Sequence, residues 1–481
     1  MTSPHQTAVL CGESESFSLP AGECESDILK RADAYEMLTD VTAGYADIRL
    51  KSRPECSAEA LRDIVDLSLW AGQLLLQHGA ETERVERCIH QLGTALGCTW
   101  LDVLVSPDAI IVTTISGQEF RTKVRRVARF GGVNMTVIAD IQMLTKKARH
   151  GELDRRDVRE TLQRVDVRPK HYNRWLLAGM IGLACASFSQ LFGGDVFVLC
   201  TTFVASSVAM FFRQELIRKH FNNLLSVAAT SFLAGTLAAA LGAFLPGQQP
   251  EIAMAAAVLM LVPGVPLINS FDDLIHGQVV SGVVRGATGM LISLSIALGL
   301  AVAVAAQGAT RLWGPLTPPQ SLLEDAVWSG IAATGFAMLF NVPRKALCAC
   351  CLCGAAGHVV RTILMHGAHG PLATIEFATF FAALFTGFMA RILARRTSLP
   401  ASIYAIPAVI PMVPGTFAFG SMMALLSAVG LLDGVAPATD EIAVLITPAL
   451  LNGAKTALIC GALAVGLKTP ALLFDRQKPI V

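Results

Sequence analysis

The chain has 481 residues and a net charge of +1, with 53% hydrophobic residues but only 16% charged residues. Globular proteins carry roughly 25% charged residues, so this composition excludes an ordinary soluble protein as a description of the whole chain. The charged residues gather between 57 and 170, and after Trp175 the chain becomes a series of apolar runs with short polar breaks. We therefore place the main domain boundary between Lys170 and Arg174.

The first 56 residues are polar and rich in Ser, Glu and Asp. They lack the basic segment followed by an apolar segment that marks a secretory signal peptide. Low hydrophobicity favours disorder. We therefore expect residues 1–56 to form a disordered tail in the cytoplasm.

A small cytoplasmic α/β domain is predicted for residues 57–170. Apolar residues at helical spacing predict helices, and short β-branched runs predict strands. The expected helices are 58–78, 81–96, 135–149 and 154–165, and the expected strands are 100–105 and 110–115. The segment 121–129 stands out only as basic.

One polar motif in this domain is a candidate functional site. Gly79 is expected to end the first helix and Thr82 to cap the second. Two carboxylates and a histidine also suggest a hydrolase or metal site, but a helix start carrying ordinary acidic residues is the favoured interpretation. The sequence contains no Gly-rich phosphate loop, so we expect no ATP-driven pump and no catalytic residues. The motif consists of His78, Gly79, Glu81, Thr82, Glu83 and Arg84.

The apolar runs predict ten membrane-spanning helices, since one span needs about 20 mostly apolar residues. These spans lie at 173–191, 195–213, 224–245, 251–270, 282–306, 326–341, 344–365, 372–393, 401–430 and 441–467.

Basic residues orient the spans, because cytoplasmic connections are enriched in Lys and Arg. With the α/β domain inside, the cytoplasmic connections carry Arg213, Arg218, Lys219, Arg285, Arg344, Lys345, Arg391, Arg395 and Arg396. The opposite connections carry Asp195, Glu251, Asp433, Asp440 and Glu441, with Arg311 and Arg361 as exceptions. Both termini are therefore expected in the cytoplasm, including a C-terminal tail at 471–481.

The membrane part is predicted to contain two halves of five helices, at 171–310 and 320–470. Val-Pro-Gly recurs within Met260–Pro266 and Pro411–Thr416, at matching places in the two halves. Chance recurrence is the less favoured alternative because the positions match. Since five is odd, the halves must be inverted relative to each other, as in many secondary transporters.

Both Val-Pro-Gly segments should break their helices, because proline removes a backbone donor and glycine adds freedom. Broken backbone at membrane depth must face protein or a wet cavity, and paired breaks mark a transporter's site. Ordinary proline kinks are the alternative. The predicted substrate-binding residues are Pro263, Gly264, Pro266, Asn269, Pro414, Gly415, Thr416, Asn452 and Lys455. Asp272 and Asp273 are either proton-coupling residues or part of a solvated loop.

Lys455 is the clearest charged residue within a predicted span. It lies about a dozen residues from either end, roughly 18 Å along a helix, which exceeds the reach of a lysine side chain. An intramembrane charge needs a partner or a task. We predict that Lys455 faces the cavity between the broken spans and meets a substrate carboxylate or Asp272.

The chain has twelve cysteines, several of them clustered at 348–353. Cysteine in an apolar helix usually acts as a small buried hydrophobe. We expect neither a metal site nor a cofactor.

The chain resembles the threonine/serine exporter family. The resemblance is carried by His-Gly-Ala-Glu-Thr-Glu-Arg-Val-Glu at 78–86, by Val-Ser-Pro-Asp-Ala-Ile-Ile at 105–111, and by the two Val-Pro-Gly spans. It covers residues 57–467 and implies a fused form of a system that some bacteria make as two chains. It also implies export of threonine and serine driven by the proton motive force, while the two-chain relatives are associated with succinate.

The expected protein is thus an α-helical polytopic protein of the bacterial cytoplasmic membrane. Its partners would be the lipid bilayer and a small amino acid or dicarboxylate, without nucleic acid, and a homo-oligomer is left open. A membrane-anchored hydrolase with a catalytic N-terminal domain is the alternative of another class, and a channel or sensor is a third. Ten spans with paired breaks exceed what anchoring needs, which favours the exporter.

Overall fold

The computed structural model describes residues 57–98, 100–116, 119–127, 132–244, 249–306, 321–367, 370–397, 399–430 and 439–474. The expected N-terminal tail and residues 475–481 of the expected C-terminal tail lie outside these described residues.

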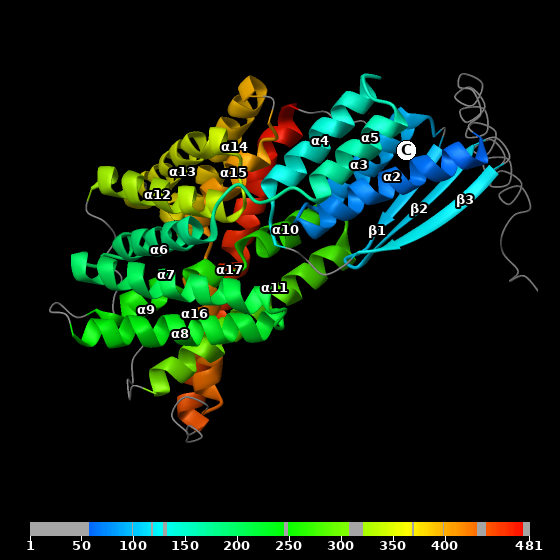
Figure 1. Cartoon of the computed structure of the whole chain (residues 1–481). Coiled ribbons are helices and arrows are strands. Elements are labelled where there is room, and N and C mark those ends of the chain that lie inside the picture. Colours follow the sequence, from blue (N-terminus) through cyan, green and yellow to red (C-terminus); the bar gives the residue numbers. More distant parts are fainter. Residues whose placement is uncertain are drawn as a thin grey trace, which may run out of the picture. The chain divides into compact units, whose positions relative to one another are not determined.

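Residues 57–166 form an α/β part in which two helices separate a sheet from two further helices (Figure 1). The helices next to the sheet are α2 (Ala58–Gln77) and α3 (Thr82–Leu96), and α4 (Met135–Arg149) and α5 (Arg155–Asp166) cover them from the other side. Ser57 caps α2 by accepting a hydrogen bond from the Ala60 backbone at 3.2 Å. The helices therefore begin close to where the sequence predicts.

The sheet is antiparallel, with the order β1 (Trp100–Val105), β2 (Ala109–Ser116) and β3 (Glu119–Arg126). In this register Val103 pairs with Val112, and Val112 pairs with Lys123. The third strand was not predicted, because its alternation runs opposite to the usual one. The basic residues Arg121, Lys123 and Arg125 are half-buried, whereas the apolar Phe120 and Val124 are exposed. Lys123 turns toward α2, where it forms an ion pair with Asp66.

The remaining helices form two consecutive sets, separated by the segment 307–320. The first set contains α6 (Arg174–Leu191), α7 (Val196–Arg218), α8 (Asn223–Ala243), α9 (Pro250–Val258), η1 (Leu259–Leu261), α10 (Gly264–Ile275) and α11 (Val279–Ala305). The second set contains α12 (Leu322–Leu339), η2 (Arg344–Ala346), α13 (Leu347–Gly367), η3 (Gly370–Ala373), α14 (Ile375–Thr397), α15 (Ser402–Val409), η4 (Ile410–Met412), α16 (Gly415–Ala428) and α17 (Thr439–Phe474).

Among the described residues, seven helices are long and apolar enough to cross a membrane, and nine spans result if each bent pair counts as one. The bent pairs are α9 with α10, at 56°, and α15 with α16, at 48°. The chain is therefore a multi-pass membrane protein. The expected first span, α6, is not among these nine, so a count of ten remains a prediction.

The two helix breaks have the same backbone conformation. Val262 has φ −58° and ψ 128°, and Val413 has φ −64° and ψ 132°. The prolines that follow match as closely, with φ −79° and ψ 55° at Pro263 and φ −78° and ψ 53° at Pro414. Each proline is followed directly by a helix start at glycine, so the repeated sequence produces a repeated break.

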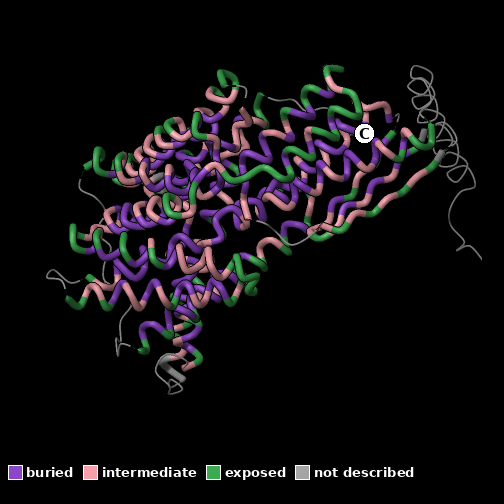
Figure 2. The backbone as a smooth tube through the Cα atoms, in the orientation of Figure 1, coloured by how far each residue is buried: buried purple, intermediate pink, exposed green. Residues whose placement is uncertain are grey.

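Small residues let the helices of the membrane part approach closely, as is common where helices pack in lipid. A Cβ atom at Gly299 would lie 2.2 Å from the carbonyl oxygen of Ala228, and one at Gly335 would lie 2.7 Å from that of Met180. Figure 2 shows that the buried residues lie in the interior of the bundle that these helices form.

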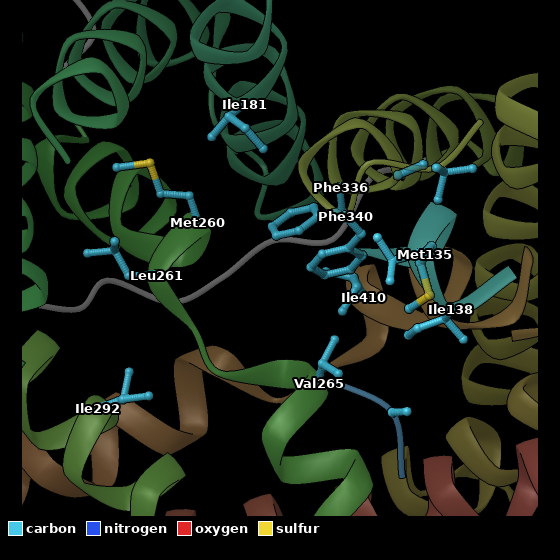
Figure 3. Packing of buried hydrophobic residues seen from close by; sticks show 14 of the residues in the cluster. Met135, Ile138, Ile181, Met260, Leu261, Val265, Ile292, Phe336, Phe340 and Ile410 are labelled. Carbon is cyan, nitrogen blue, oxygen red and sulfur yellow. The ribbon is translucent and has the colours of Figure 1, made fainter. Parts of the chain in front are cut away.

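The α/β part packs against the second helix set through α4. Met135 donates its backbone N–H to the Phe340 carbonyl at 2.8 Å, and Asn341 donates its side-chain amide to Asn134 at 2.9 Å. Figure 3 shows Met135 and Ile138 beside Phe340 and Ile410 within one buried cluster. The α/β part and the membrane part therefore share a hydrophobic core.

Candidate functional site

A cavity of about 70 Å³ lies where the two helix breaks meet. Its lining comes from α6, from both breaks, and from α12, α13, α14 and α17. The lining residues are Phe188, Phe192, Leu259, Val262, Gly264, Phe336, Arg361, Ile375, Ile410, Pro411, Met412, Val413, Pro414, Gly415, Thr416, Phe417 and Ile459.

The breaks contact each other reciprocally. A Cβ atom at Gly264 would lie 3.2 Å from Ile410 Cδ1, just before the second break. A Cβ atom at Gly415 would lie 2.8 Å from Val262 Cγ2, just before the first break. A methyl group at Gly415 would force a neighbouring atom to shift, and one at Gly264 would be tighter than ordinary contact, because each helix start packs on the segment that precedes the other.

Four of the predicted substrate-binding residues line this cavity: Gly264, Pro414, Gly415 and Thr416. Pro263 adjoins it as the residue that precedes α10. Pro266 and Asn269 lie further along α10, and Asn452 lies on α17 next to Gly420.

Lys455 has an exposed side chain, with its ammonium 5.3 Å from the ring centre of Phe417. The structure does not bring it to Asp272. The lysine at that position is Lys468, whose Nζ lies 3.0 Å from Asp272 Oδ2.

A second constellation joins the α2–α3 turn to the membrane part, and we call it the charge network. It consists of Glu81, Glu83, Arg84, Glu86, Asp272, Asp273, His276, Arg285 and Lys468. It therefore contains the three charged residues of the predicted cytoplasmic motif, Glu81, Glu83 and Arg84, and both predicted proton-coupling residues.

The turn itself is fixed by backbone contacts from the membrane part. Gly79 has φ 87°, a conformation that favours glycine. Its carbonyl accepts a hydrogen bond from the Asn269 side chain at 3.0 Å, and the Ala80 carbonyl accepts one from Arg285 at 2.9 Å. Asn269 thus contacts the α/β part.

The cap of α3 differs from the prediction. Thr82 is the first helical residue, and Glu81 at the cap position makes no side-chain cap bond. Asp273 accepts the hydrogen bond from the Thr82 backbone at 3.0 Å, and Arg285 Nε lies 3.3 Å from the same carboxylate. A residue distant in sequence therefore supplies the cap that a local reading assigns to Thr82.

The motif carboxylates are engaged in ion pairs. Glu81 Oε1 lies 2.5 Å from Arg84 Nη2 and 3.3 Å from Lys468 Nζ. Burial opposes the charge of Glu81, but Arg84 and Lys468 outweigh it and hold the pKa of that carboxyl well below its usual range. Glu83 pairs with Arg87 and lies 3.2 Å from His276 Nε2.

Glu86 behaves differently from Glu81. Burial raises its pKa to about 7, although a hydrogen bond from Gln278 at 2.8 Å opposes that change. His78 approaches its own helix through Nδ1, 2.8 Å from the Leu74 carbonyl, and burial lowers its pKa.

Sequence reasoning missed three basic residues of these sites: Arg361, Arg285 and Lys468. It treated Arg361 as an exception to the charge rule, although the residue lies inside a predicted span. An ionisable residue within an apolar helix is itself a signal for a functional site. Arg285 and Lys468 were read only as cytoplasmic charges.

In the described part of the chain, seven long apolar helices and two bent helix pairs whose breaks meet at a shared cavity define a multi-pass membrane protein. Residues 66–307 match the family described as "Putative threonine/serine exporter", and residues 325–473 match "Threonine/Serine exporter, ThrE". The chain belongs to the threonine/serine exporter family.

Curated relatives include shorter and similarly long proteins. The chain is 37% identical over 256 residues to the "Probable succinate transporter subunit YjjP" of Klebsiella aerogenes, an alignment covering 53% of this chain and 95% of that protein. The protein of the same name in Escherichia coli is 36% identical over 258 residues, covering 53% and 97%. An "Uncharacterized protein" of Haemophilus influenzae is 26% identical over 425 residues, covering 88% and 99%. No solved structure matches the chain.

Proposed function

We propose that the chain is a secondary active exporter of small carboxylate-bearing metabolites, with threonine and serine as the leading substrates. In this proposal the proton motive force across the bacterial cytoplasmic membrane drives export. One observation carries it: Arg361 and the glycine starts of two helices line one cavity.

These groups suit a carboxylate. Helix N-termini carry partial positive charge, which attracts a carboxylate. Arginine binds a carboxylate through two parallel hydrogen bonds. The other cavity walls are largely apolar, which strengthens the attraction by excluding water.

The cavity of about 70 Å³ is far smaller than the roughly 300–1,000 Å³ of ordinary ligand pockets. We take this conformation to be an occluded one between the two open states. Alternating access would then widen the cavity first toward one side of the membrane and then toward the other.

Opposite ends of the two broken helices contact the α2–α3 turn, which supports the inverted arrangement. Asp273, near the end of α10, accepts from Thr82, whereas Ser402, at the start of α15, accepts a hydrogen bond from Arg84 at 3.3 Å. The first broken span thus ends at this turn and the second begins there. In this proposal the two broken spans run in opposite directions, as inverted halves of five helices require.

We propose that the α/β part regulates opening and performs no catalysis. Glu81 and Glu83 are the carboxylates a hydrolase would need, and both are committed to ion pairs. The charge network connects the turn to the end of α10, whose other end lines the cavity. Movement of the turn would therefore act on one half of the first break.

Succinate is the second candidate substrate, because two relatives are named as succinate transporter subunits. It shares the carboxylate that the cavity suits but has no ammonium group. The preference between the two substrate classes therefore depends on whether the cavity stabilises or repels the ammonium group of an amino acid.

Counterflow in proteoliposomes tests the proposal directly. Vesicles loaded with unlabelled threonine, serine or succinate should take up the labelled form, with the amino acids leading. Arg361→Met should reduce counterflow about tenfold or more, which corresponds to roughly 1.4 kcal/mol. The exposed Arg395→Met serves as a control and should transport at the parental rate. Absence of counterflow with every one of these substrates would overturn the proposal.

A further inference from the structure

A buried acid–histidine pair lies near the cavity. Asp325, in the first turn of α12, is 1% exposed, and His358, near the middle of α13, is 8% exposed. His358 Nδ1 lies 2.8 Å and 2.9 Å from the two carboxylate oxygens of Asp325. Thr362 donates its hydroxyl to the same carboxylate at 3.0 Å. Burying ionisable groups in a membrane protein is costly, so such groups usually have a task.

The pair is linked to the cavity through Arg361. Among the described residues, the charged groups that act on His358 are Asp325 from α12 and Arg361 from its own helix. Arg361 follows His358 by about one helical turn and lines the cavity. Asp325 also acts electrostatically on Arg361. A change of charge at the pair is therefore felt at the cavity wall.

We propose that Asp325 and His358 together form the site that takes up and releases the coupling proton, an inference that rests on the proposed function. A proton from water on one side binds the pair, and the same proton leaves to water on the other side. No other bond is made or broken. Imidazole suits this task because its ordinary pKa lies near neutrality.

The charges also couple the proton to the substrate. With Asp325 ionised, His358 neutral and Arg361 charged, the cluster has no net charge. A proton on the pair makes the cluster positive and changes the electrostatic field at Arg361, where the substrate carboxylate is proposed to bind. Export driven by inward proton movement requires the proton site and the substrate site to influence each other in this way.

This site differs from the one the sequence suggested. Asp272 and Asp273 are held by Lys468, Arg285 and the Thr82 backbone. Those contacts give the two acids a role in joining the α/β part to α10. The pair near the cavity is the better placed group for coupling.

The test uses the full chain in proteoliposomes with two readouts. One is threonine movement driven by an imposed pH gradient, measured with proton flux from a pH-sensitive dye. The other is threonine counterflow without a gradient, which needs no net proton movement. Asp325→Asn and His358→Asn should lose gradient-driven movement and proton flux about tenfold or more while counterflow continues. Asp325→Glu should recover part of the gradient-driven movement with a shifted pH profile.

Glu324→Gln is the matched control, since Glu324 is the exposed neighbour of Asp325 and should leave both readouts parental. If the parent shows counterflow and both Asn variants keep the parental gradient-driven rate and pH profile, the pair is not the proton site. If the parent shows no counterflow, the proposed function itself fails. Should Asp325→Asn not fold, His358→Asn and Asp325→Glu decide, because each retains the polar contact between the helices.

Discussion

Asp273 caps a helix that begins at Thr82, with 3.0 Å between the carboxylate oxygen and the backbone nitrogen. The two residues lie 191 positions apart, on α10 and α3. A residue of the membrane part therefore caps a helix of the α/β part. Detaching the two parts would leave α3 without a cap.

Removing this cap should loosen the α/β part. Asp273→Ala should destabilise it by about 1 kcal/mol for the lost cap, and further because Arg285 loses its ion-pair partner. Limited proteolysis in detergent should then cut the α/β part faster than in the parent. Asp154→Ala removes an exposed cap of α5 and should leave the attachment unchanged. Equal proteolysis rates for the Asp273 variant and the parent would show that the cap does not hold the parts together.

Lys468 and Lys455 lie on one helix and offer a matched comparison. Lys468→Met leaves Glu81 and Asp272 without their shared cation, so transport should fall about tenfold. Lys455→Met removes an exposed charge and should transport close to the parental rate. Adding Glu81→Gln to Lys468→Met should restore part of the loss, because neighbouring charges are energetically coupled. The opposite order of effects would favour the sequence-based expectation for Lys455.

Glu86 makes stability depend on pH. Its pKa rises from 4.5 to about 7 on folding, so the folded chain retains a proton that the unfolded chain loses between those values. The resulting stabilisation is complete below pH 4.5 and is lost as the pH rises through about 7. Melting temperatures should therefore fall between about pH 5 and about pH 8, while Glu86→Gln should flatten this dependence. The exposed Glu59→Gln should keep the parental slope, and the same slope in the Glu86 variant would contradict the assignment.

The two break glycines should differ in sensitivity. A Cβ at Gly415 would lie 2.8 Å from Val262, whereas one at Gly264 would lie 3.2 Å from Ile410. Gly415→Ala should therefore reduce counterflow more than Gly264→Ala. Gly179→Ala is the control, because nothing lies within 4 Å of its added methyl group. Parental counterflow in Gly415→Ala would show that close contact between the breaks is not required.

Cysteine labelling tests the inverted arrangement. Cysteines placed at Glu251 and Arg395 in a cysteine-free chain should react from opposite sides of the membrane. Impermeant reagents should reach Glu251→Cys from outside intact cells and Arg395→Cys only after permeabilisation. Reaction of both positions from the same side would rule out the inverted arrangement.

Local features of the fold could be predicted from the sequence. Pro263 and Pro414 interrupt the helices in which they lie, because proline lacks the backbone N–H. Each Val-Pro-Gly sequence therefore predicts a helix break at its own position. The strand at 119–126 was missed because its alternation combines basic with apolar residues, and only the contact of Lys123 with Asp66 explains the pattern.

The sites depend on contacts that no local pattern reveals. Nothing in the sequence shows that Asp272 meets Lys468 and not Lys455, because the direction of a side chain on a long apolar helix is set by its neighbours. The partnership of Asp325 with His358 is hidden for the same reason. Arg361 is the exception, since its charge within a predicted span could have marked it.

The reciprocal contacts of Gly264 with Ile410 and of Gly415 with Val262 have a kinetic consequence. Because each helix start packs on the segment before the other, moving one break alone would remove contacts from both. We therefore expect the two breaks to move together more readily than one at a time, so a substitution at either glycine should change the rate at which both open.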